Sequence, residues 1–325
     1  MIIKMDKLKD VIYGLAIGDA IGVPFEFMNR KLISTCPCKD MEGNGTYNQP
    51  KGSWSDDTSL TLCLLDGIDY KNHQINIRKV ADNMILWMDE HKFTATGFRF
   101  DIGNTTRQSI TKMKNRKDAT KCGSVNDFHN GNGALMRISP LVFFLKDEND
   151  IYKRFEIVKN ITTMTHGNTL NIVGCHIYIE FMLQILKNPN NNKFEILDNT
   201  INILNDFYKD NDWEYEYAYS KYERIFNKTI FKKNKGLFNN EFDESIIKSS
   251  GYIIDSLEAS IFCFLTTKNY KESVLKAVNL GEDTDTIAAI TGSMSGLYYG
   301  IKDIPIEWIN SLLNKELINE ILDKS

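Results

Sequence analysis

Residues 6–23, DKLKDVIYGLAIGDAIGV, contain the clearest structural pattern in the chain. Its apolar residues recur at helical spacing and Asp6 is a candidate N-cap, so the pattern predicts one long helix. Gly14, Gly18 and Gly22 stand four residues apart in it. Each glycine inside a helix costs about 1 kcal/mol relative to alanine. Three of them on one stripe therefore indicate close packing against a second backbone.

A second stretch, DTIAAITGSMSGLYYG at residues 285–300, repeats the pattern near the other end of the chain. It carries Gly292, Gly296 and Gly300, again at a spacing of four. Small residues on a contact face let two helices approach closely. We therefore expect the two glycine stripes to pack together, so that a bulky side chain at Gly18 or Gly296 would push the helices apart.

The rest of the chain is also dominated by helical periodicity. Predicted helices cover residues 55–70, 77–88, 101–115, 172–186, 253–266 and 270–278. No strand-like alternation persists, and only six prolines interrupt the chain. The sequence thus predicts an all-α fold, a compact single domain over residues 1–325. Residues from about 187 to 245 are rich in Lys, Asn and Tyr, and we interpret them as a variable insertion.

Composition excludes several classes of protein. The chain has 325 residues, 42% of them hydrophobic, and a formal net charge of −4. It can form a sizeable core and has no strongly basic surface for nucleic acid. The six cysteines lack zinc-site spacing, the start lacks a signal-peptide pattern, and no apolar stretch looks long and charge-free enough to span a bilayer. We expect a cytoplasmic monomer with reduced thiols and no nucleic acid or membrane partner.

Two acidic clusters stand at the starts of predicted helices. They are WSDDT at residues 54–58 and GEDTDT at residues 281–286. One Ser, Thr or Asp is enough to cap a helix, whereas each cluster has two or more carboxylates plus hydroxyls. Crowded carboxylates repel one another unless a cation lies among them. An all-oxygen set without His or Cys indicates a hard cation such as Mg²⁺, Mn²⁺ or Ca²⁺, with helix capping as the alternative.

Taken together, six motifs resemble those of the ADP-ribosylglycohydrolase family, in the family's order along the chain. They are GDAIGVPFE (residues 18–26), WSDDT (54–58), GNGALMR (131–137), TH (165–166), GY (251–252) and GEDTDT (281–286). The resemblance covers residues from about 8 to 300. Within the family, the sequence is similar to the dinitrogenase-reductase-activating glycohydrolase branch. It implies an all-helical fold with two Mg²⁺ or Mn²⁺ ions at the bottom of a cleft.

The resemblance also implies roles for particular residues. The expected metal ligands are Ser55, Asp56, Asp57, Asp283, Asp285 and Thr286. Ser55 stands where many members have Thr. The expected catalytic carboxylates are Glu26, which some members use as a ligand or as acid/base, Asp57 and Asp101. For Asp101 the alternative interpretation is an N-cap of the helix that follows it.

The remaining motifs suit a dinucleotide-like ligand. Glycine lets a backbone approach a pyrophosphate closely, so the loop of Asn130, Gly131, Asn132 and Gly133 is a candidate binding site, with an ordinary loop as the alternative. His166 resembles a family histidine near ribose or phosphate and is otherwise structural. Tyr252 is a candidate for stacking on adenine or for core packing. Arg137 is expected to pair with a carboxylate.

The resemblance implies a metal-dependent hydrolase that removes ADP-ribose from a modified protein side chain. Arginine N-glycosides are the first choice of substrate and serine O-glycosides the second. The alternatives are a non-catalytic ADP-ribose-binding relative, a toxin-immunity relative, and a hydrolase of free ADP-ribosyl metabolites. The expected partner is accordingly an ADP-ribosylated protein or a small ADP-ribosyl conjugate.

Overall fold

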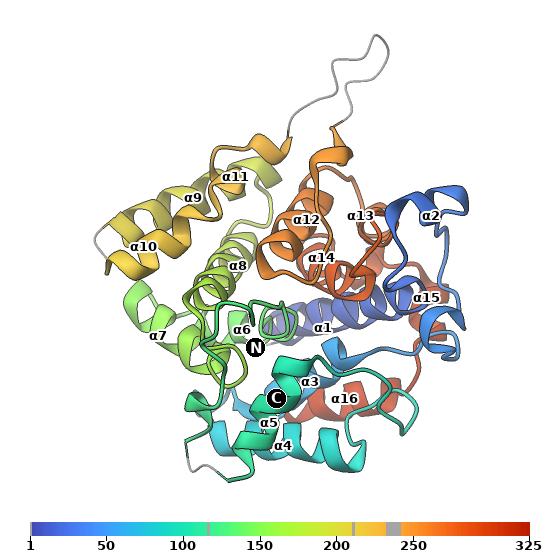
Figure 1. The fold of residues 1–325 in the computed structure, drawn as a ribbon, viewed down its shortest axis with the longest axis horizontal. Coiled ribbons are helices and arrows are strands. Elements are labelled where there is room, and N and C mark those ends of the chain that lie inside the picture. Colours follow the sequence, from blue (N-terminus) through green and yellow to red (C-terminus); the bar gives the residue numbers. More distant parts are fainter. Residues whose placement is uncertain (1, 116–117, 210–211, 232–241) are drawn as a thin grey trace.

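The computed structural model describes residues 2–115, 118–209, 212–231 and 242–325 and is built almost wholly of helices (Figure 1). The α-helices are α1 (Ile2–Gly22), α2 (Arg30–Thr35), α3 (Asp56–Leu65), α4 (Ile77–Glu90), α5 (Asn104–Met113), α6 (Leu141–Leu145), α7 (Ile151–Thr162), α8 (Thr169–Lys187), α9 (Lys193–Lys209), α10 (Trp213–Ser220), α11 (Glu223–Phe226), α12 (Ile253–Leu265), α13 (Tyr270–Asn279), α14 (Thr284–Tyr299), α15 (Ile306–Ser311) and α16 (Lys315–Lys324). Short 3-10 helices include η1 (Val23–Phe25), η2 (Gly45–Tyr47), η3 (Ala119–Lys121), η4 (Thr229–Phe231), η5 (Glu244–Ile246) and η6 (Ile301–Asp303). The predicted all-α class is confirmed.

The centre of the molecule is the pair α1 and α14, which lie side by side although they come from opposite ends of the sequence (Figure 1). The two glycine stripes meet where Gly14 packs against Gly292 and Gly296, whereas Gly18 and Gly22 pack against Ala288 and Asp285 of α14. A Cβ added to Gly14 would lie 2.3 Å from the carbonyl oxygen of Gly292, and one added to Gly18 would lie 2.1 Å from that of Ala288. Since the backbones themselves are in contact, alanine does not fit at these positions.

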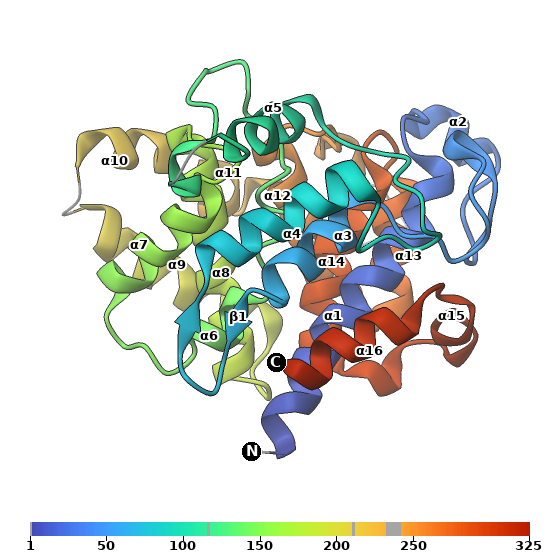
Figure 2. The ribbon, with the colours of Figure 1, turned by 90° about the horizontal axis from the view of Figure 1, so that it is seen from below.

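Other helices surround this pair. Helices α12 and α13 pack on α14, and Tyr270 of α13 donates a hydrogen bond from its hydroxyl to the carbonyl oxygen of Gly14 (2.6 Å). Helices α3 and α16 lie on the other side of α1 (Figure 2). Residues before α3 are held by the segment between α15 and α16, because Trp54 Nε1 donates to the Leu313 carbonyl at 3.0 Å. The chain just before α3 is thereby tied to the C-terminal part of the protein.

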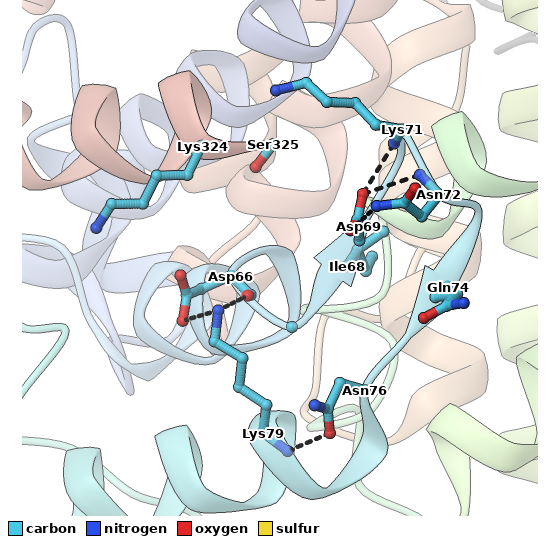
Figure 3. A pocket seen from close by; sticks show the side chains of 11 residues that line it. Asp66, Ile68, Asp69, Lys71, Asn72, Gln74, Asn76, Lys79, Lys324 and Ser325 are labelled. Atoms are coloured by element: carbon cyan, nitrogen blue, oxygen red, sulfur yellow. Dashed lines mark hydrogen bonds and ion pairs between the residues drawn. The ribbon is translucent and has the colours of Figure 1, made fainter.

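Helix α3 is shorter than the segment 55–70 predicted as helical. It ends at Leu65, and a small antiparallel hairpin follows, with β1 (Ile68–Asp69) pairing with β2 (Gln74–Ile75) (Figure 3). Asp69 stabilises the turn, since its carboxylate accepts the backbone N–H groups of Lys71 and Asn72 at 3.0 Å. A cavity of about 410 Å³ lies between this hairpin and the end of α16. Strands of two residues are too short for any sequence alternation to reveal them.

Helix α8 corrects the expectation that no stretch is long and apolar enough to span a bilayer. By length and composition alone it could cross a membrane, but 78% of its most apolar window is buried in the protein. Its charged residue Glu180 is paired within the core, accepting from Arg154 Nε and Nη2 at 2.6 and 2.8 Å. These features are typical of a core helix.

The segment 187–245 contributes α9, α10 and α11. Helices α9 and α10 pack on α8, and Tyr208 of α9 shares a 2.9 Å hydrogen bond with Nδ1 of His176. Residues 210–211 and 232–241 of this segment lie outside the described residues. That the segment is a variable insertion into one domain stays a prediction.

Candidate active site

The two acidic clusters meet at the N-terminal ends of α3 and α14. Thr286 donates from Oγ1 to Oδ2 of Asp57 at 3.3 Å, although the two residues lie 229 positions apart. Ser55, the N-cap of α3, donates from Oγ to the same carboxylate oxygen at 3.2 Å. The packing of α1, α3 and α14 thus brings the two predicted halves of the site into direct contact.

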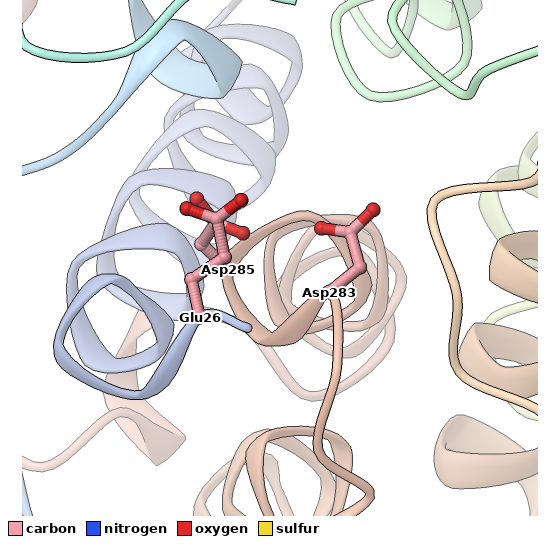
Figure 4. Close-up of side chains that lie close together, drawn as sticks. All are labelled: Glu26, Asp283 and Asp285. Atoms are coloured by element: carbon pink, nitrogen blue, oxygen red, sulfur yellow. The ribbon is translucent and has the colours of Figure 1, made fainter. Parts of the chain in front are cut away.

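Three carboxylates converge beside this contact. Oxygen atoms of Glu26, Asp283 and Asp285 all lie within 4.8 Å of one another, a spacing that could hold a metal ion (Figure 4). Glu26 follows η1, and the next residues pair with the chain before α14, where Phe27 N donates to the Glu282 carbonyl at 2.7 Å. The backbone therefore holds Glu26 against the second cluster.

Burial and mutual repulsion disfavour the charged forms of these groups. Burial, followed by the charges of Asp101 and Asp283, raises the pKa of Glu26 to about 9. Burial, followed by neighbouring carboxylates, also raises the pKa values of Asp56, Asp57 and Asp285 well above their ordinary value. A cation among these groups would reverse the repulsion.

Two oxygens in the cluster give an independent test of whether a cation fits. Glu26 Oε2 and Asp57 Oδ1 are buried without a hydrogen-bond partner within the described residues. A buried carboxylate oxygen without a donor is costly, and a hard cation satisfies it. The donor set, carboxylates and hydroxyls alone, has the chemistry that Mg²⁺ and Mn²⁺ prefer. The residues present therefore fit such an ion.

Asp19 positions the first cluster, a role that sequence reasoning missed. It lies fully buried on α1, and its carboxylate accepts from Ser55 N (2.9 Å), Thr58 N (3.0 Å) and Thr58 Oγ1 (2.6 Å). It thus holds the first turn of α3 from outside the helix. The available signal was an acidic residue in the otherwise uncharged, glycine-striped half of α1, residues 11–22.

Asn132 positions the second cluster in a similar way. Its Nδ2 donates to Asp283 Oδ2 at 2.6 Å and to Ser256 Oγ at 2.8 Å. Its backbone N–H donates to the Gly251 carbonyl at 3.0 Å. Asn132 therefore links the glycine loop, the start of α12 and the acidic cluster, and its own N–H is not free to bind a phosphate.

A pocket of about 350 Å³ opens above the carboxylates. Of the predicted metal and catalytic residues, Glu26, Asp56, Asp101, Asp283 and Thr286 line it. Ser55, Asp57 and Asp285 are almost fully buried behind them. The capping alternative for Asp101 is wrong, since Gly103 is the residue that precedes α5 as its N-cap.

The predicted ligand-binding residues divide into two groups. Gly131, Asn132, Gly133 and His166 line the pocket. A Cβ on Gly133 would lie 2.9 Å from Thr106 Oγ1 and 3.0 Å from His166 Cε1, so a larger residue there would require these side chains to shift.

Asn130 and Tyr252 lie outside the pocket lining. The side chain of Asn130 bonds the Asp127 carbonyl (2.9 Å) and Asn171 Nδ2 (3.0 Å), so it supports the loop and does not face a ligand. Tyr252 is beside Gly131 through a backbone bridge, and its side chain is 39% exposed. The core-packing alternative for Tyr252 is therefore wrong.

The expected carboxylate partner of Arg137 is not found among the described residues. Arg137 is fully buried, and its Nη2 donates to the Ile161 carbonyl (3.0 Å) and to Thr165 Oγ1 (2.9 Å). Burial lowers its pKa to about 10, so the side chain remains a cation near neutral pH. A positive charge thus lies beneath the pocket wall that carries His166.

Comparison with known proteins identifies the family of the chain. The sequence model of the ADP-ribosylglycohydrolase family matches residues 2–325. The chain is 29% identical, over 98% of its length and 79% of the relative's, to the ADP-ribosylarginine hydrolase Tri1 of Serratia proteamaculans. It is 24% identical to the ADP-ribosyl-[dinitrogen reductase] glycohydrolase of Rhodospirillum rubrum, over 94% of this chain and 90% of that one.

A solved structure supports the same fold. The ADP-ribosylglycohydrolase-related protein complex aligns with a TM-score of 0.76 and 23% identity, over all of this chain and 98% of that one. Because the family model spans nearly the whole sequence, the chain belongs to the ADP-ribosylglycohydrolase family. It is a glycohydrolase of that family and acts on ADP-ribosyl conjugates.

Proposed function

We propose that this enzyme depends on two Mg²⁺ or Mn²⁺ ions and removes ADP-ribose from a modified protein side chain, arginine first and serine second. One observation carries the metal dependence: buried carboxylates converge, with the unpartnered oxygens of Glu26 and Asp57 among them. Near neutral pH such a cluster is stable only when it is protonated or bound to a cation.

The proposed ligands come from both clusters. Asp56, Asp283 and Thr286 reach the pocket, and Ser55, Asp57 and Asp285 complete the set from behind it. When bound, the ions would supply Lewis-acid polarisation of substrate and water oxygens. Asp19 and Asn132, which hold the clusters in place, act as positioning residues.

The pocket walls suggest how the substrate lies. The ribose joined to the target side chain would face the acidic floor, and the pyrophosphate would face Gly131, Gly133 and His166. Because Tyr252 is exposed next to this loop, it would stack at the adenine end of the ligand.

The carboxylates would carry the chemistry of bond cleavage. As the leaving group departs, the anomeric carbon develops positive charge of the oxocarbenium kind, which negative groups at the floor stabilise. Asp101 and Asp283 both line the pocket, and a carboxylate oxygen of Glu26 lies within 4.8 Å of oxygens of Asp283 and Asp285. We assign Glu26, Asp57 and Asp101 to charge stabilisation and proton transfer, with Glu26 or Asp101 as the acid that protonates the leaving group.

The preference for arginine rests on relatives. The curated proteins of Serratia proteamaculans and Pseudomonas putida, 29% and 27% identical, are named ADP-ribosylarginine hydrolases. A non-catalytic relative is disfavoured because both acidic clusters are complete. A toxin-immunity role and hydrolysis of free ADP-ribosyl metabolites are the alternatives. A cytoplasmic location and a monomeric state also stay predictions.

The metal proposal is tested by removing and restoring the ion. We expect EDTA followed by dialysis to abolish release of ADP-ribose, and Mg²⁺ or Mn²⁺ to restore it. Full turnover in metal-free buffer would contradict the proposal. Titration calorimetry on the metal-free enzyme should then give a stoichiometry of two ions per chain.

The substrate proposal is tested by comparing linkages under the same conditions. The assay offers ADP-ribosyl-arginine and ADP-ribosyl-serine, each as a modified protein and as a small conjugate. We expect the highest kcat/KM for the arginine linkage on protein. Faster hydrolysis of the small conjugates would favour the metabolite alternative, and faster release from serine would reverse the order of substrates.

A further inference from the structure

The inference concerns a buried hydrogen-bonded chain behind the pocket, Arg137 to Thr165 to His166. Arg137 Nη2 lies 2.9 Å from Thr165 Oγ1, and the same hydroxyl oxygen lies 3.0 Å from His166 Nδ1. Arg137 and Thr165 are fully buried, and His166 is 2% exposed. The three groups are therefore shielded from bulk water.

The direction of each hydrogen bond follows from the donors available. Arginine can only donate, so Thr165 Oγ1 is the acceptor of the bond from Arg137. The hydroxyl still has one proton of its own to donate. Within the described residues its only other partner is His166 Nδ1, so the proton points at that nitrogen. An Nδ1–H would point at the same oxygen and leave the hydroxyl proton without an acceptor, so we assign His166 Nδ1 as the acceptor, without a proton.

This assignment leaves the ring proton of a neutral His166 on Nε2. That nitrogen lies beside the glycine loop, 3.6 Å from the Cβ position of Gly133 and 3.8 Å from that of Gly131, and His166 lines the pocket. Burial, followed by the charge of Arg137, lowers the pKa of His166 to about 3, so the ring stays neutral near pH 7. The ring offers the pocket one N–H donor.

The backbone around Thr165 keeps this arrangement rigid. The Thr165 carbonyl accepts from Ser109 Oγ at 2.9 Å and from Ser124 N at 3.3 Å. The same segment closes against Gly123, where an added Cβ would lie 2.4 Å from the Thr163 carbonyl. The hydroxyl therefore has little freedom to turn away from the ring.

We propose that Arg137 and Thr165 are positioning residues that fix His166 as the tautomer with its proton on Nε2, a fixed donor to an oxygen of the bound ADP-ribosyl group. The second half of this statement rests on the proposed function. His166 then binds the ligand and does not act as general acid or base. Neither Arg137 nor Thr165 needs to touch the substrate.

The tautomer is measured first, on metal-free protein without ligand. Nitrogen-15 NMR of histidine-labelled protein distinguishes Nε2–H from Nδ1–H and from the imidazolium, and His166→Gln assigns the signal. We expect the Nε2–H pattern in the parent and in Thr165→Ser, which keeps the hydroxyl. Thr165→Val keeps the shape of the side chain but has no hydroxyl, and in this variant we expect a mixture of tautomers. Nδ1–H or imidazolium in the parent at pH 7 would overturn the proposal.

Binding is measured second, with ADP-ribose in Mg²⁺ buffer. We expect Thr165→Val to weaken ADP-ribose binding and to raise KM by roughly three- to tenfold, the effect of one hydrogen bond, with kcat nearly unchanged. Thr165→Ser should restore both the tautomer and the affinity, and a melting curve checks that each variant is folded. If Thr165→Val keeps the Nε2–H signal and full affinity, Thr165 is not a positioning residue.

Different results would refute the proposed hydrolysis and the proposed hydrogen-bonded chain. An Nε2–H signal in a metal-loaded parent that releases no ADP-ribose would refute the proposed hydrolysis and leave the hydrogen-bonded chain supported. Normal hydrolysis by a parent with the proton on Nδ1 would refute the chain alone.

Discussion

Replacing Gly22 with alanine should damage the acidic site through helix packing alone. Gly22 is the last residue of α1, and an added Cβ would lie 2.3 Å from Cα of Asp285, one of the three converging carboxylates. The nearest atoms are all backbone, so no side chain can rotate out of the way. The new methyl group must therefore move the start of α14.

The size of the displacement follows from the contact distance. Cβ atoms essentially never approach a heavy atom closer than 3.0 Å, so the backbones must separate by about 0.7 Å. Overpacking of this kind destabilises a protein by about 1–3 kcal/mol. Misplacing reacting groups by about 1 Å lowers the rate about a hundredfold, so we expect a loss of roughly 10- to 100-fold in kcat/KM.

Gly296→Ala is the matched control. Its Cβ would lie 2.2 Å from the Asp10 carbonyl in the same helix pair, a similar overlap. Gly296 stands eleven residues beyond Asp285, about 16 Å along α14. Both variants should lose similar stability in a melting experiment. Only Gly22→Ala should lose most of its Mg²⁺ affinity and turnover.

The measurements are the melting temperature, the Mg²⁺ dissociation constant and the release of ADP-ribose, for both variants and the parent. An equal loss of turnover and metal affinity in the folded Gly22 and Gly296 variants would refute the expectation that packing beside Asp285 controls the site geometry. Parent-like behaviour of Gly22→Ala in all three measurements would do the same.

Three further predictions concern single carboxylates and the ligand. Asp285→Ala should abolish most metal binding and turnover, and should raise the melting temperature of the metal-free protein because it relieves repulsion between carboxylates. Tyr252→Ala should weaken ADP-ribose binding several-fold and leave the Mg²⁺ dissociation constant unchanged. An equal loss of metal affinity in the two variants would contradict these roles. The pKa of Glu26 is 4.5 in an unfolded chain and about 9 here, so the folded metal-free protein holds the extra proton between these values and its melting temperature should fall as pH rises through that window. Glu26→Gln should flatten this slope, and an unchanged slope would show that other groups cause it. Asp19→Asn should lower both stability and metal affinity, measured by melting and calorimetry, since one of its carboxylate oxygens would become a donor facing the N–H groups of α3.

Much of the fold follows from periodicity and glycine spacing. The stripe of α1 predicted its contact with α14, because only glycine allows two helix backbones to touch. The ends of helices were less predictable. The segment 55–70 continued an apolar pattern through Ile68, whereas Gly67 and the turn at Asp69 end α3 and begin a hairpin. Local hydrogen bonds of this kind leave no periodic signal.

The residues of the candidate site also divide into those that the sequence predicts and those that it does not. The clusters at Asp56 and Asp283 were recognisable because they contain more carboxylates than helix capping needs. Asp19 was not, since its partners lie 36 and 39 residues away and nothing in its own helix indicates them. Arg137 shows the converse error: a buried arginine suggests a carboxylate partner, but here a carbonyl and a hydroxyl accept its protons. Such pairings depend on tertiary packing alone.

The pairing of α1 with α14 sets the order in which the enzyme can form. Thr284 donates to the Gly22 carbonyl across 262 positions, so α1 leaves the ribosome long before its partner helix exists. Until then its glycine-lined face has no surface to cover it, and only Glu26 and the first cluster are present. A nascent chain therefore contains half of the acidic site and cannot hold a metal between the two halves. Contacts of such long range form late and slowly, which makes the incomplete chain the stage most exposed to aggregation.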